Sequence, residues 1–112
     1  MAYTLKIGER APDFNLLGTD DVFHDLSSYR KHEILIISFT CNHCPYVIGS
    51  DETTRKTVEK YSQESIKLVC INSNSKNTYQ EDSFENMQAR MKEHKFPWDY
   101  LHDESQETAT NY

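Results

Sequence analysis

The chain has 112 residues, a formal net charge of −6 and 37% hydrophobic residues. This length suits one small domain, and the acidic balance argues against a nucleic-acid-binding protein, which needs a basic face for the phosphates. No stretch is apolar over the length that a membrane-spanning helix needs, and the charged start MAYTLKIGER is not typical of a secretory signal. We therefore expect a cytoplasmic protein with no nucleic-acid or membrane partner.

Residues 1–32 contain turn-forming residues between short apolar pieces. Pro12, Gly18 and the pair Asp20–Asp21 punctuate the segment around the stretches FNLL and VFHDL. This pattern predicts an N-terminal β-hairpin or two short strands. We expect this β extension and a core at 33–112 to form a single domain.

Three apolar segments predict the strands of the core. EILIISF, at residues 33–39, is a continuous apolar run rich in isoleucine, which is typical of a strand covered on both faces. IKLVCI, at 66–71, predicts a second strand, and FPWDYL, at 96–101, predicts a short third one. Pro97 cannot donate a ladder hydrogen bond, so it indicates a sheet edge or the start of a strand.

Helices are predicted between and after these strands. The first is expected to run from near Cys41 or Cys44 to about Ser62. The second is expected to start at Asp82, which begins a pattern similar to a capping box. The third is expected in DESQETATNY, with Asp103 as its cap.

The alternation of strands and helices predicts an α/β layer fold whose first two core strands are parallel. Sites in open α/β sheets lie at the carboxyl ends of the strands. FTCNHCPYV, at residues 39–47, follows the first core strand, so we expect its cysteines at that end of the sheet. Asn72, Ser73 and Asn74 leave the second strand at the same end and are candidates for substrate contact.

A C-x-x-C pair at a strand-to-helix junction suits thiol–disulfide exchange. Helix N–H groups and the positive end of the helix dipole stabilise a thiolate there, which makes Cys41 the candidate nucleophile. Cys44 lies close enough to attack a mixed disulfide and is the candidate resolving cysteine. His43 would favour the thiolate further, and Pro45 is tolerated in the first helical turn, where N–H groups have no helical partner.

Two other interpretations of the cysteines remain open. The pair could bind copper or zinc together with His43, although the sequence has no second C-x-x-C and no H-x-x-x-H to complete a zinc site. In a non-catalytic interaction domain, by contrast, Cys41 would react as an ordinary thiol. Cys70 lies inside an apolar strand and is expected to be an inert buried thiol.

Ordered matches along nearly the whole chain resemble the thioredoxin-like superfamily, specifically its redoxin branch related to alkyl hydroperoxide reductases and thiol-specific antioxidant proteins. GERAPDFNL is similar to the redoxin N-terminal strand motif. FTCNHCPYV, CINSN and DSFENM are similar to a group of bacterial thioredoxin-family proteins with a CNHCP active site.

The resemblance implies a three-layer α/β/α thioredoxin-like fold and a thiol–disulfide oxidoreductase that contributes to cell redox homeostasis. It implies no cofactor beyond a redox-active disulfide between Cys41 and Cys44. The partners would be protein or small-molecule disulfides and an electron-donating dithiol system. Supporting positions around the two cysteines would be Thr40, Asn42, His43 and Pro45.

The chemistry departs from the family pattern at two places. Ile36 stands where the peroxiredoxin motif Pro-x-x-x-Thr-x-x-Cys has its proline, which disfavours an antioxidant peroxidase but leaves it as an alternative. Leu35 replaces the buried acid that thioredoxins carry six residues before the first cysteine. Proton transfer at Cys44 would then need water or another carboxylate, for which Glu81 and Asp82 are candidates.

A third departure concerns the end of the chain at Tyr112. Family members continue there into a segment with a cis-proline, a β-hairpin and a last helix. We therefore expect that the 112 residues belong to a longer protein. The alternative is that another chain covers the open apolar edge of residues 33–39 through dimerisation or swapping.

Overall fold

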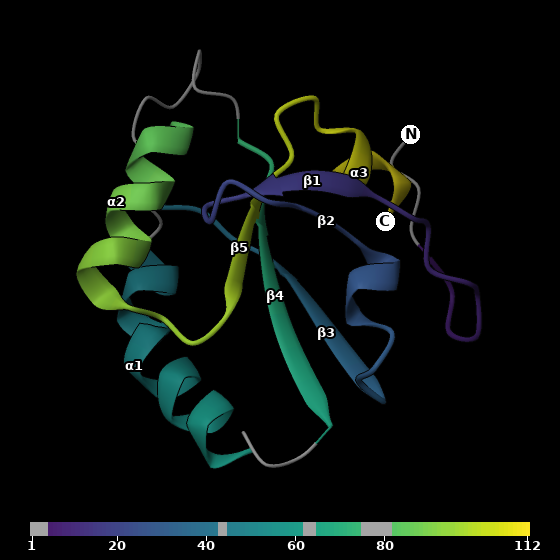
Figure 1. Ribbon diagram of the computed structural model, residues 1–112, viewed down its shortest axis with the longest axis horizontal. Helices are drawn as coiled ribbons and strands as arrows, with labels where there is room; N and C mark the ends of the chain where they lie inside the picture. The colour runs from purple at the N-terminus through teal and green to yellow at the C-terminus, as the bar shows by residue number, and fades with distance from the viewer. Residues whose placement is uncertain (1–4, 43–44, 62–64, 75–81) are drawn as a thin grey trace.

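The computed structural model describes residues 5–42, 45–61, 65–74 and 82–112. Within them, five strands form one sheet in the order β2-β1-β5-β4-β3 (Figure 1). The pairs β3–β4 and β4–β5 are parallel, whereas β1 is antiparallel to both β2 and β5. The elements are β1 (Asn15–Gly18), β2 (Phe23–Asp25), the 3-10 helix η1 (Leu26–Tyr29), β3 (Ile34–Phe39), α1 (Pro45–Lys60), β4 (Ile66–Asn72), α2 (Phe84–His94), β5 (Asp99–His102) and α3 (Glu107–Asn111).

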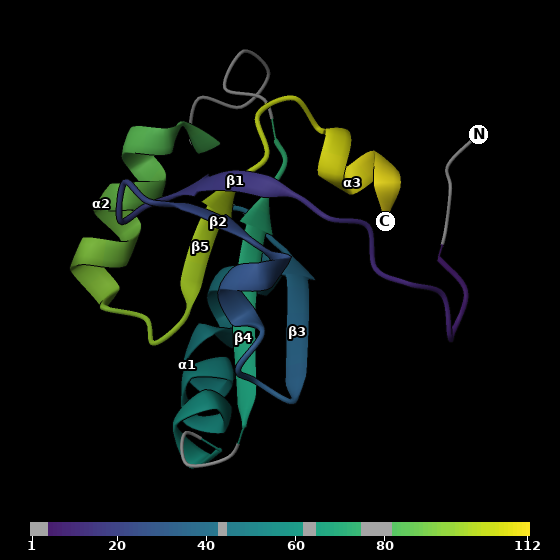
Figure 2. The same ribbon diagram turned by 45° about the vertical axis from the view of Figure 1, so that its right-hand side comes forward.

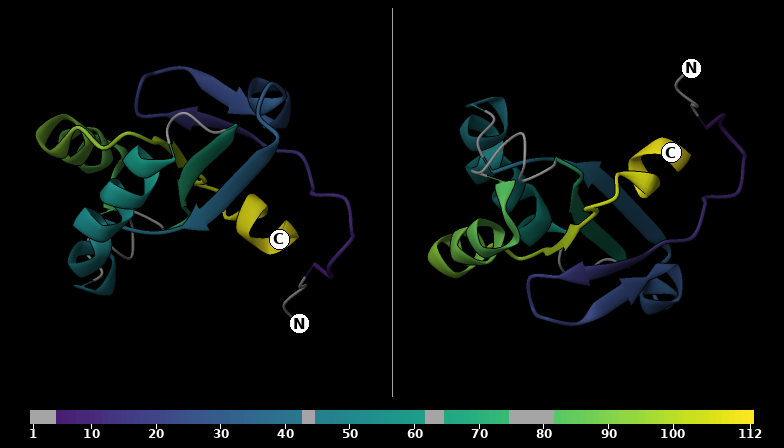
Figure 3. Two further views of the ribbon diagram at one scale, coloured as in Figure 1. Left: turned by 90° about the horizontal axis from the view of Figure 1, so that it is seen from below. Right: turned by 90° about the horizontal axis from the view of Figure 1, so that it is seen from above.

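Helices cover both faces of the sheet, which confirms the predicted three-layer α/β/α arrangement. Figure 2 shows α1 and α2 together on one side, and the end views of Figure 3 show α3 on the other. Successive residues of β4 point to opposite faces, so the strand contributes to two apolar cores. One core contains Phe14, Tyr29, Val69, Ile71 and Leu101, and the other contains Cys70, Met87, Phe96, Trp98 and Tyr100.

The N-terminal hairpin of β1 and β2 confirms the prediction for this segment. The N–H of Gly18 donates to the carbonyl of Val22 at 2.8 Å and closes the turn. A Cβ atom at Gly18 would lie 2.5 Å from Oδ1 of Asp20 and 3.0 Å from the ring of His24. Any larger residue here would displace the side chains of Asp20 and His24, which bind each other at 2.9 Å.

β3 is an edge strand of the described sheet. The prediction that both of its faces are covered is wrong, because several of its apolar side chains are about half exposed. Leu35 and Ile37 pack on the core, but Ile34, Ile36 and Phe39 are 52%, 49% and 43% exposed. The continuous apolar run, which does not alternate with polar residues, is typical of a strand covered on both faces and is the reason for that prediction. The position at an edge agrees with the expected open apolar edge.

α1 contacts the rest of the molecule through polar bonds to α2 and through Val58, which packs against the apolar core. No described residue of α1 is fully buried. Arg90 of α2 donates to Asp51 of α1 at 2.6 Å, and Arg55 of α1 donates to the carbonyls of His94 and Lys95 at the end of α2.

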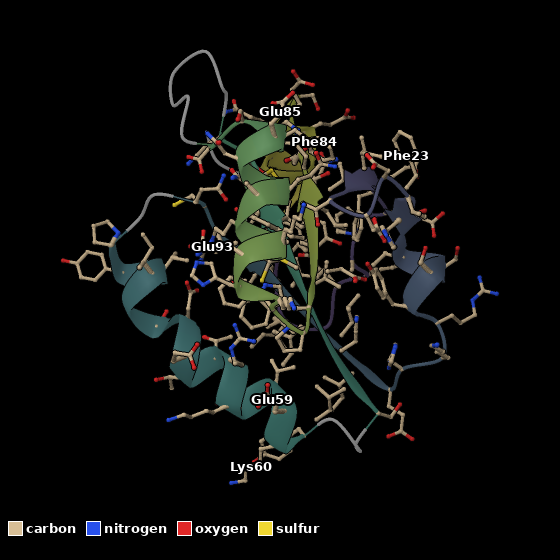
Figure 4. All side chains as sticks on the ribbon, turned by 60° about the vertical axis from the view of Figure 1, so that its left-hand side comes forward. Phe23, Glu59, Lys60, Phe84, Glu85 and Glu93 are labelled. Atoms are coloured by element: carbon tan, nitrogen blue, oxygen red, sulfur yellow. The ribbon has the colours of Figure 1, made fainter. Side chains whose placement is uncertain are left out.

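α2 begins one residue after the position that the capping pattern indicated. Its N-cap is Ser83, whose hydroxyl accepts a hydrogen bond from the N–H of Asn86 at 3.2 Å. Asp82 is therefore not the cap, and the prediction of that role is wrong. Figure 4 shows Phe84 in the first turn of α2, where it packs against the core beneath the helix.

β5 lies between β1 and β4, so an edge position for this strand is wrong. Pro97 precedes the strand, which begins at Asp99, and so interrupts no ladder bond. α3 likewise begins later than predicted, with Gln106 as its N-cap. The Asp103 carboxylate nevertheless caps the helix from a distance, because it accepts from the N–H groups of Thr108 and Ala109.

Candidate active site

Cys41 lies at the carboxyl end of β3, in the segment that leads to α1. The strand ends at Phe39, and the N–H of Thr40 still donates to the carbonyl of Ile71 on β4 at 2.8 Å. Cys41 itself is half-buried, and α1 begins at Pro45. Lys60, labelled in Figure 4, marks the far end of that helix. The position of Cys41 at a strand-to-helix junction is therefore as predicted.

His43 and Cys44 lie outside the described residues. Their proposed roles, including a disulfide between Cys44 and Cys41, therefore stay predictions. Glu81, one of the two candidate proton acceptors, also lies outside them. Pro45 occupies the first position of α1, where proline is favoured because its φ angle is already helical and no N–H is needed.

The loop after β4 lies beside Cys41, as the parallel strands required. Ser73 and Asn74 share an open cavity of about 360 Å³ with Cys41, whose other lining residues are Phe39, Thr40, Val47 and Ala109. Asn72 differs from its two neighbours because its side chain is fully buried. It points into the protein and donates hydrogen bonds to Asp82 and to Tyr100.

A buried polar network lies behind the Cys41 loop. The backbone N–H of Asn42 donates to Oδ1 of Asp82 at 2.6 Å, and the hydroxyl of Tyr100 donates to Oδ1 of Asn42 at 2.8 Å. Asn72 donates to the same carboxylate oxygen of Asp82 at 3.0 Å, and Asn74 donates to its other oxygen at 2.9 Å. The residue after Cys41 is thus tied to β4, to β5 and to the start of α2.

Tyr100 is a member of this network that the sequence did not indicate. It lies in a short apolar strand, where a tyrosine is ordinarily a core residue. Burial raises its pKa above the usual range, the hydrogen bond from Asn72 opposes this, and the charge of Asp82 raises the pKa further. The hydroxyl therefore keeps its proton at neutral pH and can donate it to Asn42.

A second cavity, of about 250 Å³, extends from Cys41 into the space between the sheet and the two helices α1 and α2. Its walls include Asp51, Cys70, Arg90 and Tyr100. Burial raises the pKa of Cys70 to about 12, with a further increase from Asp51 and an opposing effect of Arg90. Cys70 is therefore a protonated, buried thiol, which agrees with its predicted inert character.

The structure leaves the metal-binding alternative open. Among the described residues, no group of three histidine, cysteine or acidic side chains is arranged to hold a metal ion. His43 and Cys44, which the alternative needs, are not part of that set. In the same part of the chain, no helix combines the length and apolar character that crossing a membrane requires.

Two solved structures resemble this chain over nearly its whole length. A chain from Geobacillus kaustophilus, described as an uncharacterized conserved protein, is 34% identical with a TM-score of 0.88 over 96% of this chain and 58% of its own length. A hypothetical protein from Sinorhizobium meliloti 1021 is 29% identical with a TM-score of 0.89, over 96% of this chain and 59% of its own. The chain thus spans less than three-fifths of these two proteins.

A thiol-disulfide oxidoreductase from Bacteroides fragilis NCTC 9343 has the same architecture. Its TM-score is 0.72 at 19% identity, over 93% of this chain and 74% of its own. The chain therefore has a thioredoxin-like fold. Residues 6–112 also match the family model described as Redoxin, and the chain belongs to the redoxin family. No curated protein matches the sequence.

Proposed function

We propose that this chain is a thiol–disulfide oxidoreductase that acts through Cys41 and Cys44. The observation that carries the proposal is the position of Cys41, half-buried at the end of β3 and open to the cavity beside Ser73 and Asn74. Membership of the redoxin family supports redox chemistry in general. The thiol-disulfide oxidoreductase from Bacteroides fragilis shows that the same fold supports this reaction class.

The reaction would take place in two exchange steps. The Cys41 thiolate, favoured by the nearby N-terminus of α1, attacks one sulfur of a substrate disulfide. A mixed disulfide forms, and the other substrate sulfur leaves as a thiolate that takes up a proton. Cys44 then loses its proton and attacks the Cys41 sulfur, so that a Cys41–Cys44 disulfide forms and the second substrate thiol leaves.

Two electrons pass in this way from the protein dithiol to the substrate. The pair must then be reduced again by a second dithiol system, which is the electron-donating partner that we propose. The substrate would be a protein or a small-molecule disulfide, and no bound cofactor is needed. A cytoplasmic location, where such dithiol systems operate, belongs to the same proposal.

Serine substitutions test the assignment. With insulin as the disulfide and dithiothreitol as the electron donor, Cys41→Ser should abolish catalysed reduction. Reduced Cys44→Ser, freed of dithiothreitol and then mixed with insulin, should accumulate a mixed disulfide visible by mass spectrometry. Cys70→Ser is the matched control and should keep the wild-type rate, because the Cys70 thiol is buried and protonated. Wild-type rates in both Cys41→Ser and Cys44→Ser would reject the proposal. One equivalent of copper or zinc in protein purified without chelator would support the metal-binding alternative instead.

A further inference from the structure

Asp82 is a buried carboxylate that contacts the backbone beside the proposed nucleophile. Its side chain is fully buried, and its Oδ1 accepts the N–H of Asn42 at 2.6 Å. That nitrogen is bonded directly to the carbonyl carbon of Cys41. The carboxylate therefore lies within one peptide unit of the Cys41 backbone, although the two residues are far apart in sequence.

Hydrogen bonds from several parts of the fold hold the Asp82 carboxylate in place. Asn72, in the last position of β4, bridges the network by donating to Asp82 at 3.0 Å and to the Tyr100 hydroxyl at 3.1 Å. Tyr100 in turn donates to the Asn42 side chain at 2.8 Å. These bonds form a closed ring in which Asp82 holds the main chain of Asn42 and Tyr100 holds its side chain. A ring of this kind restricts the loop after Cys41 to one arrangement.

We propose that Asp82 is a positioning residue for Cys41, which fixes the loop through the Asn42 amide and whose negative charge keeps the Cys41/Cys44 pair more reducing than the same site without it. The inference rests on the proposed exchange function of the two cysteines. It assigns to Asp82 a role in setting the direction of electron flow, which the position of Cys41 alone leaves open.

The direction of the effect on the reduction potential follows from electrostatics. A negative charge close to Cys41 disfavours its thiolate, and a less stable thiolate destabilises the reduced form of the pair. Burial of Asp82 keeps solvent and salt from screening the interaction. The pair is then a better electron donor, with a lower reduction potential.

The other titratable and charged side chains around the cavity of about 250 Å³ are less suited to this role. They are Asp51 on α1, Cys70 on β4, Arg90 on α2 and Tyr100 on β5. Asp51 and Arg90 form an ion pair with each other, so their charges largely cancel at Cys41. Cys70 and Tyr100 are protonated at neutral pH because burial raises both pKa values.

The test is the equilibrium of the Cys41/Cys44 pair with reduced and oxidised glutathione at pH 7. Wild-type protein is measured first, because a pair with no reversible equilibrium would reject the proposed function rather than the role of Asp82. Asp82→Asn removes the charge and keeps an acceptor oxygen for Asn42. Because the charge that is lost lies within one peptide unit of the Cys41 backbone and is buried, we expect the disulfide to become about tenfold easier to reduce, equivalent to about 30 mV.

Two control variants separate the charge from other effects. Asp99→Asn makes the same change of charge at the first residue of β5, whereas Cys41 lies at the carboxyl end of the parallel strands. Asp99 accepts a hydrogen bond from Tyr29 at 2.8 Å, and its substitution should leave the equilibrium within about twofold of wild type. Tyr100→Phe removes the bond to Asn42 but keeps the charge of Asp82, and should shift the equilibrium by less than about threefold. An Asp82→Asn equilibrium within threefold of wild type, or a shift equal to that of Asp99→Asn, would overturn the proposal.

If Asp82→Asn does not fold, a further variant tests whether the charge of Asp82 affects the redox equilibrium. Asn74→Ala removes a donor from Asp82 Oδ2 at a half-buried position, so the carboxylate charge is less neutralised. The pair should then become harder to reduce, by about twofold to threefold, which is opposite in sign to the effect of Asp82→Asn. A shift toward easier reduction in Asn74→Ala would contradict the proposed role of the charge.

Discussion

The ion pair between Arg90 and Asp51 is expected to fasten α1 to α2, and Arg90→Met tests this. The two side chains are each only 13% exposed, and Nη2 of Arg90 lies 2.6 Å from Oδ2 of Asp51. The guanidinium also lies over the ring of Phe96, 4.8 Å from its centre. Methionine has a similar length and can fill the same space, so the substitution removes the charge with little loss of volume.

The expected cost comes mainly from the carboxylate that is left behind. Removing one partner of a buried ion pair costs roughly 3 kcal/mol, because the remaining charge stays desolvated. Loss of the contact with Phe96 adds about 0.5–1 kcal/mol. The double variant Asp51→Asn/Arg90→Met has no unpaired charge and should lose only about 1–2 kcal/mol. The Asp51→Asn single variant completes the double-mutant cycle, and the two single losses should together exceed the loss of the double variant by at least about 2 kcal/mol.

Urea unfolding measures these changes, with Trp98 as the fluorescent reporter, because its indole is buried and stacks on Phe96 at 4.5 Å. Arg55→Met is the matched control. Arg55 lies over the same ring at 4.9 Å, but its acidic partner Glu52 is 71% exposed, and the carbonyls to which it donates belong to the exposed residues His94 and Lys95. This variant should therefore lose about 1–2 kcal/mol, less than Arg90→Met. Equal losses for Arg90→Met and Arg55→Met, or a double variant as unstable as the sum of its singles, would refute the reasoning.

Two further predictions concern buried groups. Burial raises the pKa of Cys70 to about 12 and raises the pKa values of Tyr29 and Tyr100 above their usual range. Because these groups are protonated when folded and ionise when unfolded, each lowers stability by about 1.4 kcal/mol per pH unit above its unfolded pKa, which is about 9 for the cysteine and about 10 for the tyrosines. Urea unfolding between pH 8 and 11 measures this, and an unchanged slope above about pH 10 in Tyr100→Phe would contradict it. Asp103→Ala removes the acceptor for the N–H groups of Thr108 and Ala109 and for the Ser73 hydroxyl. The free energy of unfolding should fall by about 2–3 kcal/mol, which is more than for Asp103→Asn, and urea unfolding measures both variants.

The strands and their order along the chain could be predicted because the signals are local. The isoleucine-rich run at 33–39 and the apolar run at 66–71 each match a strand to within one residue. The turn residues around Gly18 likewise predict the N-terminal hairpin. Local patterns did not give the place of a strand in the sheet. β5 is central only because β1, far away in sequence, pairs with it.

The polar contacts could not be predicted because they join residues that are distant in sequence. Arg55 binds Glu52 within α1 but also two carbonyls at the end of α2, about forty residues away in sequence. Asp82 matches a helix cap in local sequence, yet its carboxylate accepts the N–H of Asn42. A polar side chain has several local partners within reach, so only the tertiary structure decides which of them it binds.

The placement of Cys41 therefore depends more on the interior strands than on the helix that follows it. α1 has no fully buried described residue and borders an apolar cavity of about 390 Å³ against β3 and β4. The residue after Cys41, by contrast, is bonded to Asp82 and to Tyr100, which are both buried. Loosening α1 through Arg90→Met should then leave the Cys41 loop in place, while changes at Asp82 act on it directly. Stability of the helix and the position of the Cys41 loop are in this sense separable properties of the chain.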